Sequence, residues 1–579
     1  GRVRTQSAVT VDLFGNRNTS VSRGCIEGCS AADEIITSTT VASRRSDDPT
    51  GWMWRTIDSY VTGNVHTEQR KRSLVEYDLT GNPTTTKMVV SGSIYLPRYQ
   101  QTSPGVYIDI ASQPANATVD GTVTLGTTYY DAFGSPIVRV GAGNRCTQVV
   151  YEDLYAEHAT YEYVHAGAVG AVATQAGTFD CGTTPIAYRA PTYDRGLGLV
   201  LFALDPHLQA TEIVYDGFGR LSRLLGPSLS SPGSPHPIPK LMVSYSLPTD
   251  ATKQPFALMR TLTQDGPAYN WDPQFRAAYA YVDGMGRTLA TLDQADSEAG
   301  DGGDWIVNGL ADWDTKGAAR RAYLSWYHTG DPSDFPLSTS PPTRYGRQRY
   351  DAFGRAVQLF GLDGTVTLQT KYHALSTDAW DAADLAPGPH QGTYASSRKD
   401  GHGRAVETTE RVHAGETIEA HRVSMAYLPS GAVSSIARIN GSDYVKRWMR
   451  YDTQDRMVLN AESHVTDYWS EDETIAPGAM NAPMYAYSDG GDLVGTTDAR
   501  GCGQTFFHDA AGRMLPEDYS PCTPHHPDWT PVDLATGDGA EVFYRYDTID
   551  PDSAAIATEN PACVFDDALA IGRVSSISD

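Results

Sequence analysis

The sequence lacks an apolar run long enough to cross a membrane as a helix. Its longest one, Gly196 to Leu204, is about half of the roughly 18 residues that a spanning helix needs. Basic residues are also scarce, since 45 Lys and Arg face 70 Asp and Glu in 579 residues, for a net charge of −25. Charge of this sign repels phosphate backbones and anionic lipids. We therefore expect no membrane span and no nucleic-acid partner.

Cysteine is too rare to form the scaffold of the chain, and seven residues leave at least one thiol unpaired within it. Cys25 and Cys29 are close enough to bridge, and Cys502 and Cys522 flank a loop-like stretch, so either pair would fit an oxidising compartment. A zinc site at 522–526 is the competing hypothesis. It would offer one crowded group of ligands, and no C-x-x-C pair occurs, so we favour a proline-rich loop.

The local motifs of several enzyme classes are missing. There is no G-x-S-x-G elbow and no Walker A sequence. Gly284–Thr288 and Gly401–Arg404 begin like dinucleotide loops, but the third Gly and the βαβ context are absent, so we interpret both as turns. We expect no catalytic chemistry, no cofactor and no metal site in this chain.

Two further binding hypotheses stay open. The stretch from Asp293 through Asp304 carries several carboxylates that could surround Ca²⁺, although its spacing fails the EF-hand pattern and a solvated insertion is the simpler interpretation. Exposed aromatic residues could also bind sugar, but Trp in a sheet more often belongs to a core. The candidates for sugar binding are Trp52, Trp54, Trp305 and Trp326.

Long amphipathic helical patterns are scarce as well, while 33 Tyr, 54 Gly and 34 Pro favour strands joined by tight turns. The best helical candidate is short and spans Ser376 to Leu385, before Pro387. Alternation of apolar and polar residues predicts a hairpin from Arg355–Phe360 and Thr365–Tyr372. Similar patterns predict strands at 444–451 and 541–546, so the expected fold class is all-β.

A repeated Tyr-Asp-x-Phe-Gly-Arg motif runs from one end of the chain to the other. The aromatic ends a strand, Asp bonds its own backbone to start a turn, Gly takes the left-handed conformation, and Arg begins the returning strand. Each copy therefore predicts one hairpin, and hairpins must stack to bury their faces. The residues that carry the repeat are Tyr130, Asp131, Gly134, Tyr215, Asp216, Phe218, Gly219, Arg220, Asp283, Gly286, Arg287, Tyr350, Asp351, Phe353, Gly354, Arg355, Asp400, Gly403, Arg404, Tyr451, Asp452, Arg456, Asp509, Gly512 and Arg513.

The repeat resembles the RHS or YD repeat of bacterial polymorphic toxins, Tc-toxin B and C components, SpvB-like proteins and animal teneurins. The resemblance implies hairpins wound as a continuous spiral sheet, forming part of a large hollow shell that holds a C-terminal toxin. It also implies a secreted or cell-surface bacterial protein. Its expected partners are its own toxin payload, encoded downstream, and a Tc-A-like translocation pore or a cell-surface receptor.

The sequence departs from that family at its autoprotease core. Its one Asp-Pro-x-Gly, at Asp48–Gly51, lies near the start and lacks the flanking core sequence, so we expect neither the aspartyl autoprotease nor the toxin here. We expect a piece cut from a longer protein, with an N-terminal region at 1–125 and a shell segment at 126–579 that continues beyond the chain.

The predicted function is a toxin-carrying shell. An adhesion module of teneurin or wall-associated type and a glycan-binding β-protein remain the alternatives.

Overall fold

The computed structural model describes residues 2–29, 32–44, 54–103, 106–112, 114, 116–228, 230–247, 256–266, 274–334, 341–440, 443–463, 482–499, 502–520, 530–549 and 570–578. Over these residues the chain is almost entirely β, and successive strands pair antiparallel as hairpins. None of the helices in the described ranges is long and apolar enough to span a bilayer. The predicted all-β class is confirmed.

The strands of the described ranges form a 20-stranded sheet, an 18-stranded sheet and a two-stranded arm. The first sheet contains β1 (Arg4–Val11), β2 (Arg17–Glu27), β3 (Ile36–Arg44), β4 (Trp54–Gly63), β5 (Arg70–Tyr77), β6 (Pro83–Val90), β9 (Gly121–Tyr130), β10 (Pro136–Gly141), β11 (Arg145–Tyr151), β12 (Ala159–Thr174), β13 (Gly177–Asp194), β14 (Leu199–Leu204), β15 (Ala210–Tyr215), β16 (Leu221–Leu225), β17 (Leu241–Ser246), β18 (Ala257–Asp265), β19 (Gln274–Val282), β20 (Thr288–Gln294), β21 (Trp305–Asn308) and β24 (Trp326–His328). The arm is β7 (Leu96–Ser103) with β8 (Val106–Ser112).

The second sheet continues the chain after a break in the pairing. It contains β22 (Ala311–Trp313), β23 (Ala319–Tyr323), β25 (Tyr345–Tyr350), β26 (Ala356–Phe360), β27 (Val366–Tyr372), β28 (Ser376–Asp381), β29 (Ala395–Lys399), β30 (Ala405–Ala414), β31 (Thr417–Tyr427), β32 (Val433–Asn440), β33 (Asp443–Tyr451), β34 (Met457–Ala461), β35 (Met484–Tyr487), β36 (Leu493–Thr497), β37 (Gly503–His508), β38 (Met514–Ser520), β39 (Val542–Tyr546) and β40 (Val574–Ser578). The break arises because β24 turns back to pair with β21, while β23 pairs onward with β25.

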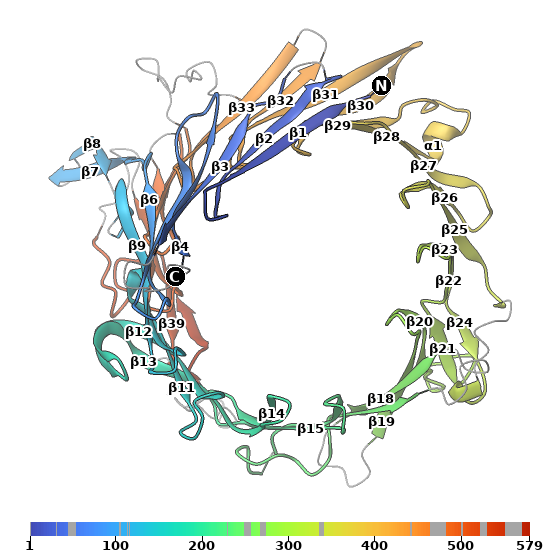
Figure 1. Cartoon of the computed structure of the whole chain (residues 1–579), viewed down its shortest axis with the longest axis horizontal. Helices are drawn as coiled ribbons and strands as arrows, with labels where there is room; N and C mark the ends of the chain where they lie inside the picture. The colour runs from blue at the N-terminus through green and yellow to red at the C-terminus, as the bar shows by residue number, and fades with distance from the viewer. Residues whose placement is uncertain are drawn as a thin grey trace.

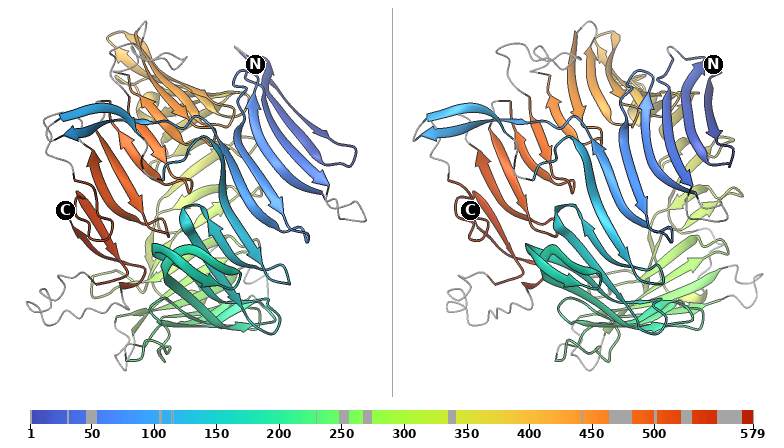
Figure 2. Two further views of the ribbon diagram at one scale, coloured as in Figure 1. Left: turned by 90° about the vertical axis from the view of Figure 1, so that its left-hand side faces the viewer. Right: turned by 60° about the vertical axis from the view of Figure 1, so that its left-hand side comes forward.

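The sheets form a single wall that winds around an open middle (Figure 1). The chain completes one circuit and then runs beside its own beginning, so that β30–β33 lie next to β1–β3 (Figures 1 and 2). A wall open on both faces exposes much more surface than a solid body. The chain exposes 32,674 Å², whereas a compact monomer of 62.7 kDa exposes about 20,000 Å².

The hairpin predicted at residues 355–372 is confirmed, because β26 pairs with β27 through the turn at 361–365. The helix predicted from Ser376 to Leu385 is wrong over most of its length. Residues 376–381 form strand β28, which pairs with β27 on one side and β29 on the other, and only α1 (Ala382–Leu385) is helical. Pairing on both edges outweighs the local helical pattern of a short segment.

The disulfide prediction was partly right. Cys25 and Cys29 are bonded, and a second disulfide joins Cys146 to Cys181, a pair that the sequence spacing does not predict. Cys502 is also disulfide-bonded, while Cys522, its predicted partner, lies outside the described residues. The predicted domain boundary at 125/126 falls within β9, and the sheet runs through it without interruption.

Candidate functional site: the seam between two windings

The intact motif copies form one kind of turn, which the copy at residues 351–355 illustrates. The Asp351 Oδ1 atom accepts the backbone N–H groups of Phe353 at 2.9 Å and Arg355 at 3.0 Å, and Oδ2 accepts Nε of Arg355 at 2.7 Å. Gly354 has a φ of 79°, which favours glycine. The carboxylate therefore ties both the backbone and the side chain of the turn together.

A valine at Gly354 tests this geometry. Space around the site is open, with no atom within 4 Å of an added Cβ, so the expected penalty comes from the positive φ alone. We expect Gly354→Val to lower the free energy of unfolding by about 2 kcal/mol. The control is Ala352→Val in the same turn, where φ is not positive. Equal urea midpoints for the two variants would contradict the prediction.

The turns divide into two groups, according to whether another winding covers them. Those of the first winding make a rim that no other described segment covers, which we call the free rim, with turns at 12–16, 78–82, 131–135, 216–220, 283–287, 314–318 and 351–355. Those of the second winding, at 400–404, 452–456, 488–492, 509–513 and 570–573, contact loops at the opposite edge of the first winding. We call this contact line the seam. The predicted motif residues from 130 to 355 therefore lie on the free rim, and those from 400 to 513 on the seam.

The seam begins where the turn after β29 meets the loop between β2 and β3. Oδ2 of Asp33 accepts the backbone N–H of Gly401 at 2.7 Å and that of Cys25 at 2.6 Å. One carboxylate thereby joins the two windings. Nε2 of His402 lies 2.8 Å from the carbonyl oxygen of Glu34, on the same loop.

The turn after β33 makes the densest group of seam contacts. Nη2 of Arg70 donates to the carbonyl oxygen of Asp452 at 2.5 Å, and Nε donates to Oδ1 of Asp455 at 3.1 Å. Ser91 and Thr453 bond reciprocally, each through its backbone N–H, at 2.9 Å. The Asp452 side chain is only 1% exposed and still binds Arg456 in the same way as the free-rim turns do.

Asp455 explains why this copy departs from the motif. It stands where the other copies have Gly and keeps the positive φ, at 63°. Asp tolerates that conformation better than most residues. In return, its carboxylate accepts Ser430 Oγ at 2.7 Å and pairs with the cations of Arg70 and Lys71. The substitution therefore converts a plain turn into a seam contact.

Further along the seam, Nη2 of Arg145 donates to Oδ1 of Asp492 at 2.5 Å. Asp509 Oδ2 accepts the backbone N–H of Gly167 at 3.0 Å, and the carbonyl of Gly167 accepts Ala510 N–H at 3.2 Å. Arg513 binds Asp509 and also a second carboxylate, that of Asp547. The contacts at Gly167 repeat the pattern in which a turn of the second winding caps backbone groups of the first.

An apolar cluster fills the seam near the base of the arm. Leu96, at the start of β7, is fully buried against side chains of the second winding. Its buried neighbours in the cluster are Leu459, Ala461, Ala482, Met484, Ala486 and Val494. Burial of apolar surface from both windings therefore stabilises the seam in addition to its hydrogen bonds.

Both disulfides of known pairing stand beside seam loops. The carboxylate of Asp33 accepts the backbone N–H of Cys25 and also that of Gly401 in the second winding. Cys146 directly follows Arg145, which binds Asp492 across the seam. The pair Cys146–Cys181 spans 35 residues and joins β11 to β13, with the whole of β12 between the two cysteines in the sequence. Spacing alone could not reveal it.

The carboxylates of the turns should make the folded protein less stable in acid. The hydrogen bond from Arg220 lowers the pKa of Asp216, and Arg195 lowers the pKa of Glu152 to about 2, in both cases against desolvation. Lowered pKa values mean that the native state is stabilised above the unfolded values near pH 4, and that this stabilisation is lost as the pH falls from about 4 to 2. We expect the melting temperature to fall over that interval. Glu152→Gln should make the fall shallower, and an equally steep profile would contradict the assignment.

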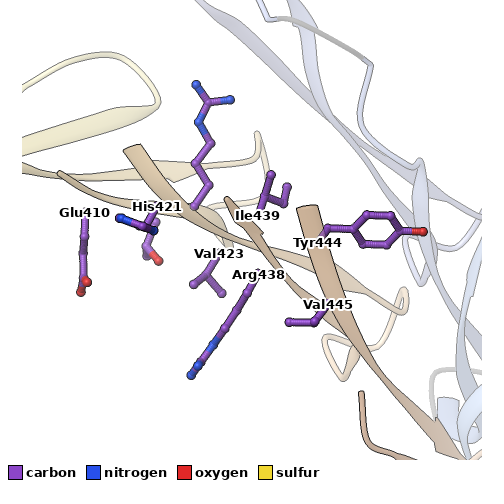
Figure 3. Close-up of a pocket in the computed structure, with 9 residues that line it drawn as sticks. Glu410, His421, Val423, Arg438, Ile439, Tyr444 and Val445 are labelled. Atoms are coloured by element: carbon purple, nitrogen blue, oxygen red, sulfur yellow. The ribbon is translucent and has the colours of Figure 1, made fainter. Parts of the chain in front are cut away.

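A pocket of about 520 Å³ lies across β30–β33 (Figure 3). Its lining includes Glu410 and His421, which are cross-strand neighbours, together with Arg438. Strand alternation places Ile439 and Tyr444 on the other side of the strands from Arg438 and Val445, as the figure shows. Glu410, His421 and Arg438 lie together on the face of Val445, because His421 pairs with Glu410 and lies two residues from Val423, the partner of Arg438.

The acidic loop at 293–304 uses its carboxylates for structure. Asp301 accepts the backbone N–H of Asp296 at 2.8 Å and the Tyr327 hydroxyl at 2.8 Å, and Asp304 accepts the N–H of Gly330 at 3.0 Å. Among the described residues, no group of three His, Cys, Asp or Glu side chains could hold a metal.

The tryptophan side chains of the sugar-binding hypothesis are engaged in packing. Trp305 and Trp326 pack against a buried cluster around Tyr281, and the Trp54 ring lies 4.8 Å from that of Phe14. Trp52 lies outside the described residues.

Comparison with known proteins identifies the class of fold. No protein-family profile and no curated relative matches the chain. Solved structures do match: "Crystal Structure of TcdB2-TccC3" has a TM-score of 0.52 at 13% identity, over 92% of this chain and 37% of that one. "Crystal Structure of TcdB2-TccC3-Cdc42" has 0.55 at 11% identity, over 94% and 39%. The Tc holotoxin pore of Photorhabdus luminescens has 0.53 at 12%, over 95% and 39%.

The chain thus has the fold of a Tc-toxin B–C shell. The resemblance to RHS and YD-repeat proteins that the motifs indicated is confirmed at the level of the fold. The chain spans less than two-fifths of the length of the structures it matches.

Proposed function

We propose that this chain is a wall segment of a secreted or cell-surface toxin shell, which encloses and carries a toxin domain encoded downstream. The observation that carries the proposal is the double winding: one antiparallel wall encircles an open middle and is sealed against itself along the seam (Figure 1). Such a wall isolates what it surrounds without needing catalytic groups of its own. A Tc-A-like pore or a cell-surface receptor would be its delivery partner.

Protease protection in the longer natural protein tests carriage. We expect the segment encoded after Asp579 to resist trypsin while the shell is intact, because the wall excludes the protease. Asp452→Ala, which weakens the seam, should make that segment digestible sooner. Asp351→Ala, in the same kind of turn on the free rim, is the matched control and should leave protection intact.

Equal digestion of the downstream segment in the intact protein and in Asp452→Ala would contradict carriage. An ordinary stop or a surface anchor soon after Asp579 would favour the adhesion alternative instead. The proposal also expects no turnover by this chain, so a hydrolase activity that one point substitution abolishes would overturn it.

A further inference from the structure

Two histidines lie beside one contact of the seam, one on each winding. In that contact Oδ2 of Asp509 accepts the backbone N–H of Gly167 at 3.0 Å, and Ala510 donates its own N–H to the carbonyl of Gly167 at 3.2 Å. His165 lies two residues before Gly167 on β12, and His508 directly precedes Asp509 at the end of β37. Imidazole is the side chain whose ordinary pKa lies between about pH 5 and 8. This contact therefore carries a titratable group on each side.

His165 is buried in the wall of the first winding. It is only 6% exposed, and among the described residues no partner stands in hydrogen-bonding geometry to either ring nitrogen. Its cross-strand neighbours are the disulfide-bonded Cys146 on β11 and Pro185 on β13, neither of which carries charge, and the ring of Tyr163 lies 6.5 Å away. Burial lowers the pKa of His165, and the backbone of Gly182 opposes that shift only in part.

His508 departs from the repeat at the position before the turn. The other seam copies around it have tyrosine there, at Tyr451, Tyr487 and Tyr546. A tyrosine hydroxyl stays uncharged in mild acid, since its ordinary pKa is about 10. The histidine therefore replaces a group that does not titrate near neutral pH with one that does.

The surroundings of His508 disfavour its charged form. The guanidinium of Arg145 lies against the turns on either side, because it binds Asp492 and would clash with a Cβ added at Gly512. Burial lowers the pKa of His508, the carboxylates of Asp492 and Asp509 raise it in part, and Arg145 lowers it further. The net shift is downwards.

Both imidazoles thus favour the neutral form while the seam is closed. Opening the contact exposes the rings to water, and their pKa values return towards about 6.5. The open form then binds more protons than the closed one, so the closed contact has its full stability above about pH 6.5 and loses it as the pH falls below that value. The carboxylates of the turns titrate at about pH 4 and below, outside this interval.

The seam contact at Gly401 lacks this sensitivity. Nδ1 of His402 lies 2.9 Å from Oγ of Ser22, and Nε2 lies 2.8 Å from the carbonyl oxygen of Glu34. A protonated imidazole donates from both nitrogens, and both of these oxygen atoms can accept. Protonation of His402 therefore leaves the contact intact.

We propose that mild acid opens the seam locally, at the contact between Gly167 and the turn after β37, and leaves the contact at Gly401 closed. Proton uptake by His165 and His508 drives the opening. The inference rests on the double winding alone and does not depend on what the wall encloses.

Hydrogen exchange of the longer natural protein, followed by mass spectrometry from pH 7 to 5.5 and corrected for the intrinsic exchange rate at each pH, tests this inference. In peptides that contain Gly167 and Ala510 we expect the opening equilibrium to rise by up to roughly tenfold for each histidine. The peptide that contains Gly401 should keep its protection. Because the readout lies at the seam itself, failure of carriage would leave this result unchanged.

Two substitutions identify the groups that take up the protons. His508→Tyr supplies the residue of the neighbouring copies, and His165→Leu removes the buried ring. Each should reduce the rise by the share of one histidine, and the double variant should abolish it. Near-ultraviolet circular dichroism at pH 7 checks folding, and His508→Tyr alone decides the outcome if His165→Leu does not fold.

The matched control is His413→Tyr, at an exposed histidine of β30 that bonds within the second winding, and it should leave the rise unchanged. Three results would each overturn the proposal: a flat wild-type profile at Gly167, a wild-type profile in the variants that fold, or loss of protection at Gly401 over the same pH interval.

Discussion

Asp452→Ala is expected to lower the free energy of unfolding by about 3–5 kcal/mol, the largest loss we foresee for a single turn. The side chain is buried in the seam and holds Arg456, whose guanidinium also donates to the Ser488 carbonyl and the Thr118 hydroxyl. Removing the carboxylate leaves that guanidinium buried without its counter-charge. Urea unfolding measures the change.

The matched control is Asp351→Ala, which removes the same motif residue from a turn on the free rim. Its partner, Arg355, has an exposed guanidinium that water can solvate once the carboxylate is gone. We therefore expect a much smaller shift of the midpoint. Similar shifts for Asp351→Ala and Asp452→Ala would mean that the seam adds nothing to the stability of its turns.

Arg513→Gln is expected to have a comparable effect. Arg513 lies between the carboxylates of Asp509 and Asp547, at 2.6 Å and 2.5 Å, and both carboxylates are almost fully buried. Without the guanidinium, two buried like charges face each other, which costs about 3–5 kcal/mol at neutral pH. Urea unfolding measures the loss.

A second substitution tests whether the two carboxylates cause the loss. Adding Asp547→Asn to Arg513→Gln removes one of the two facing charges, so it should restore stability at neutral pH. A double variant no more stable than Arg513→Gln would contradict this account.

The sequence predicts where hairpins form but does not predict how they pair and stack. The motif at Tyr350–Arg355 contains all that its turn requires, because Asp and Gly act within five residues. The segment at 376–381 was predicted wrongly because its fate depends on pairing with β27 and β29 rather than on local preference. The disulfide between Cys146 and Cys181 depends on the folding back of β12 and β13.

The seam was missed for a related reason, since its partners lie several hundred residues apart. One local signal could have found part of it. Asp455 stands where the other copies of the motif have Gly, and its carboxylate contacts the first winding through Arg70.

The seam also fixes how many residues the chain uses for one circuit of the wall. Partners across it are separated by 382 residues at Arg70 and Asp452 and by 342 at Gly167 and Asp509, so each circuit consumes a nearly constant length of wall. Inserting one hairpin into the wall of the first circuit would shift the register of the seam, so that every later turn would face a different loop of the first winding. Added sequence can instead leave the wall sideways, as the β7–β8 arm does (Figure 2). Chains of this construction can therefore gain length by branching outward, while the number of hairpins per circuit stays fixed.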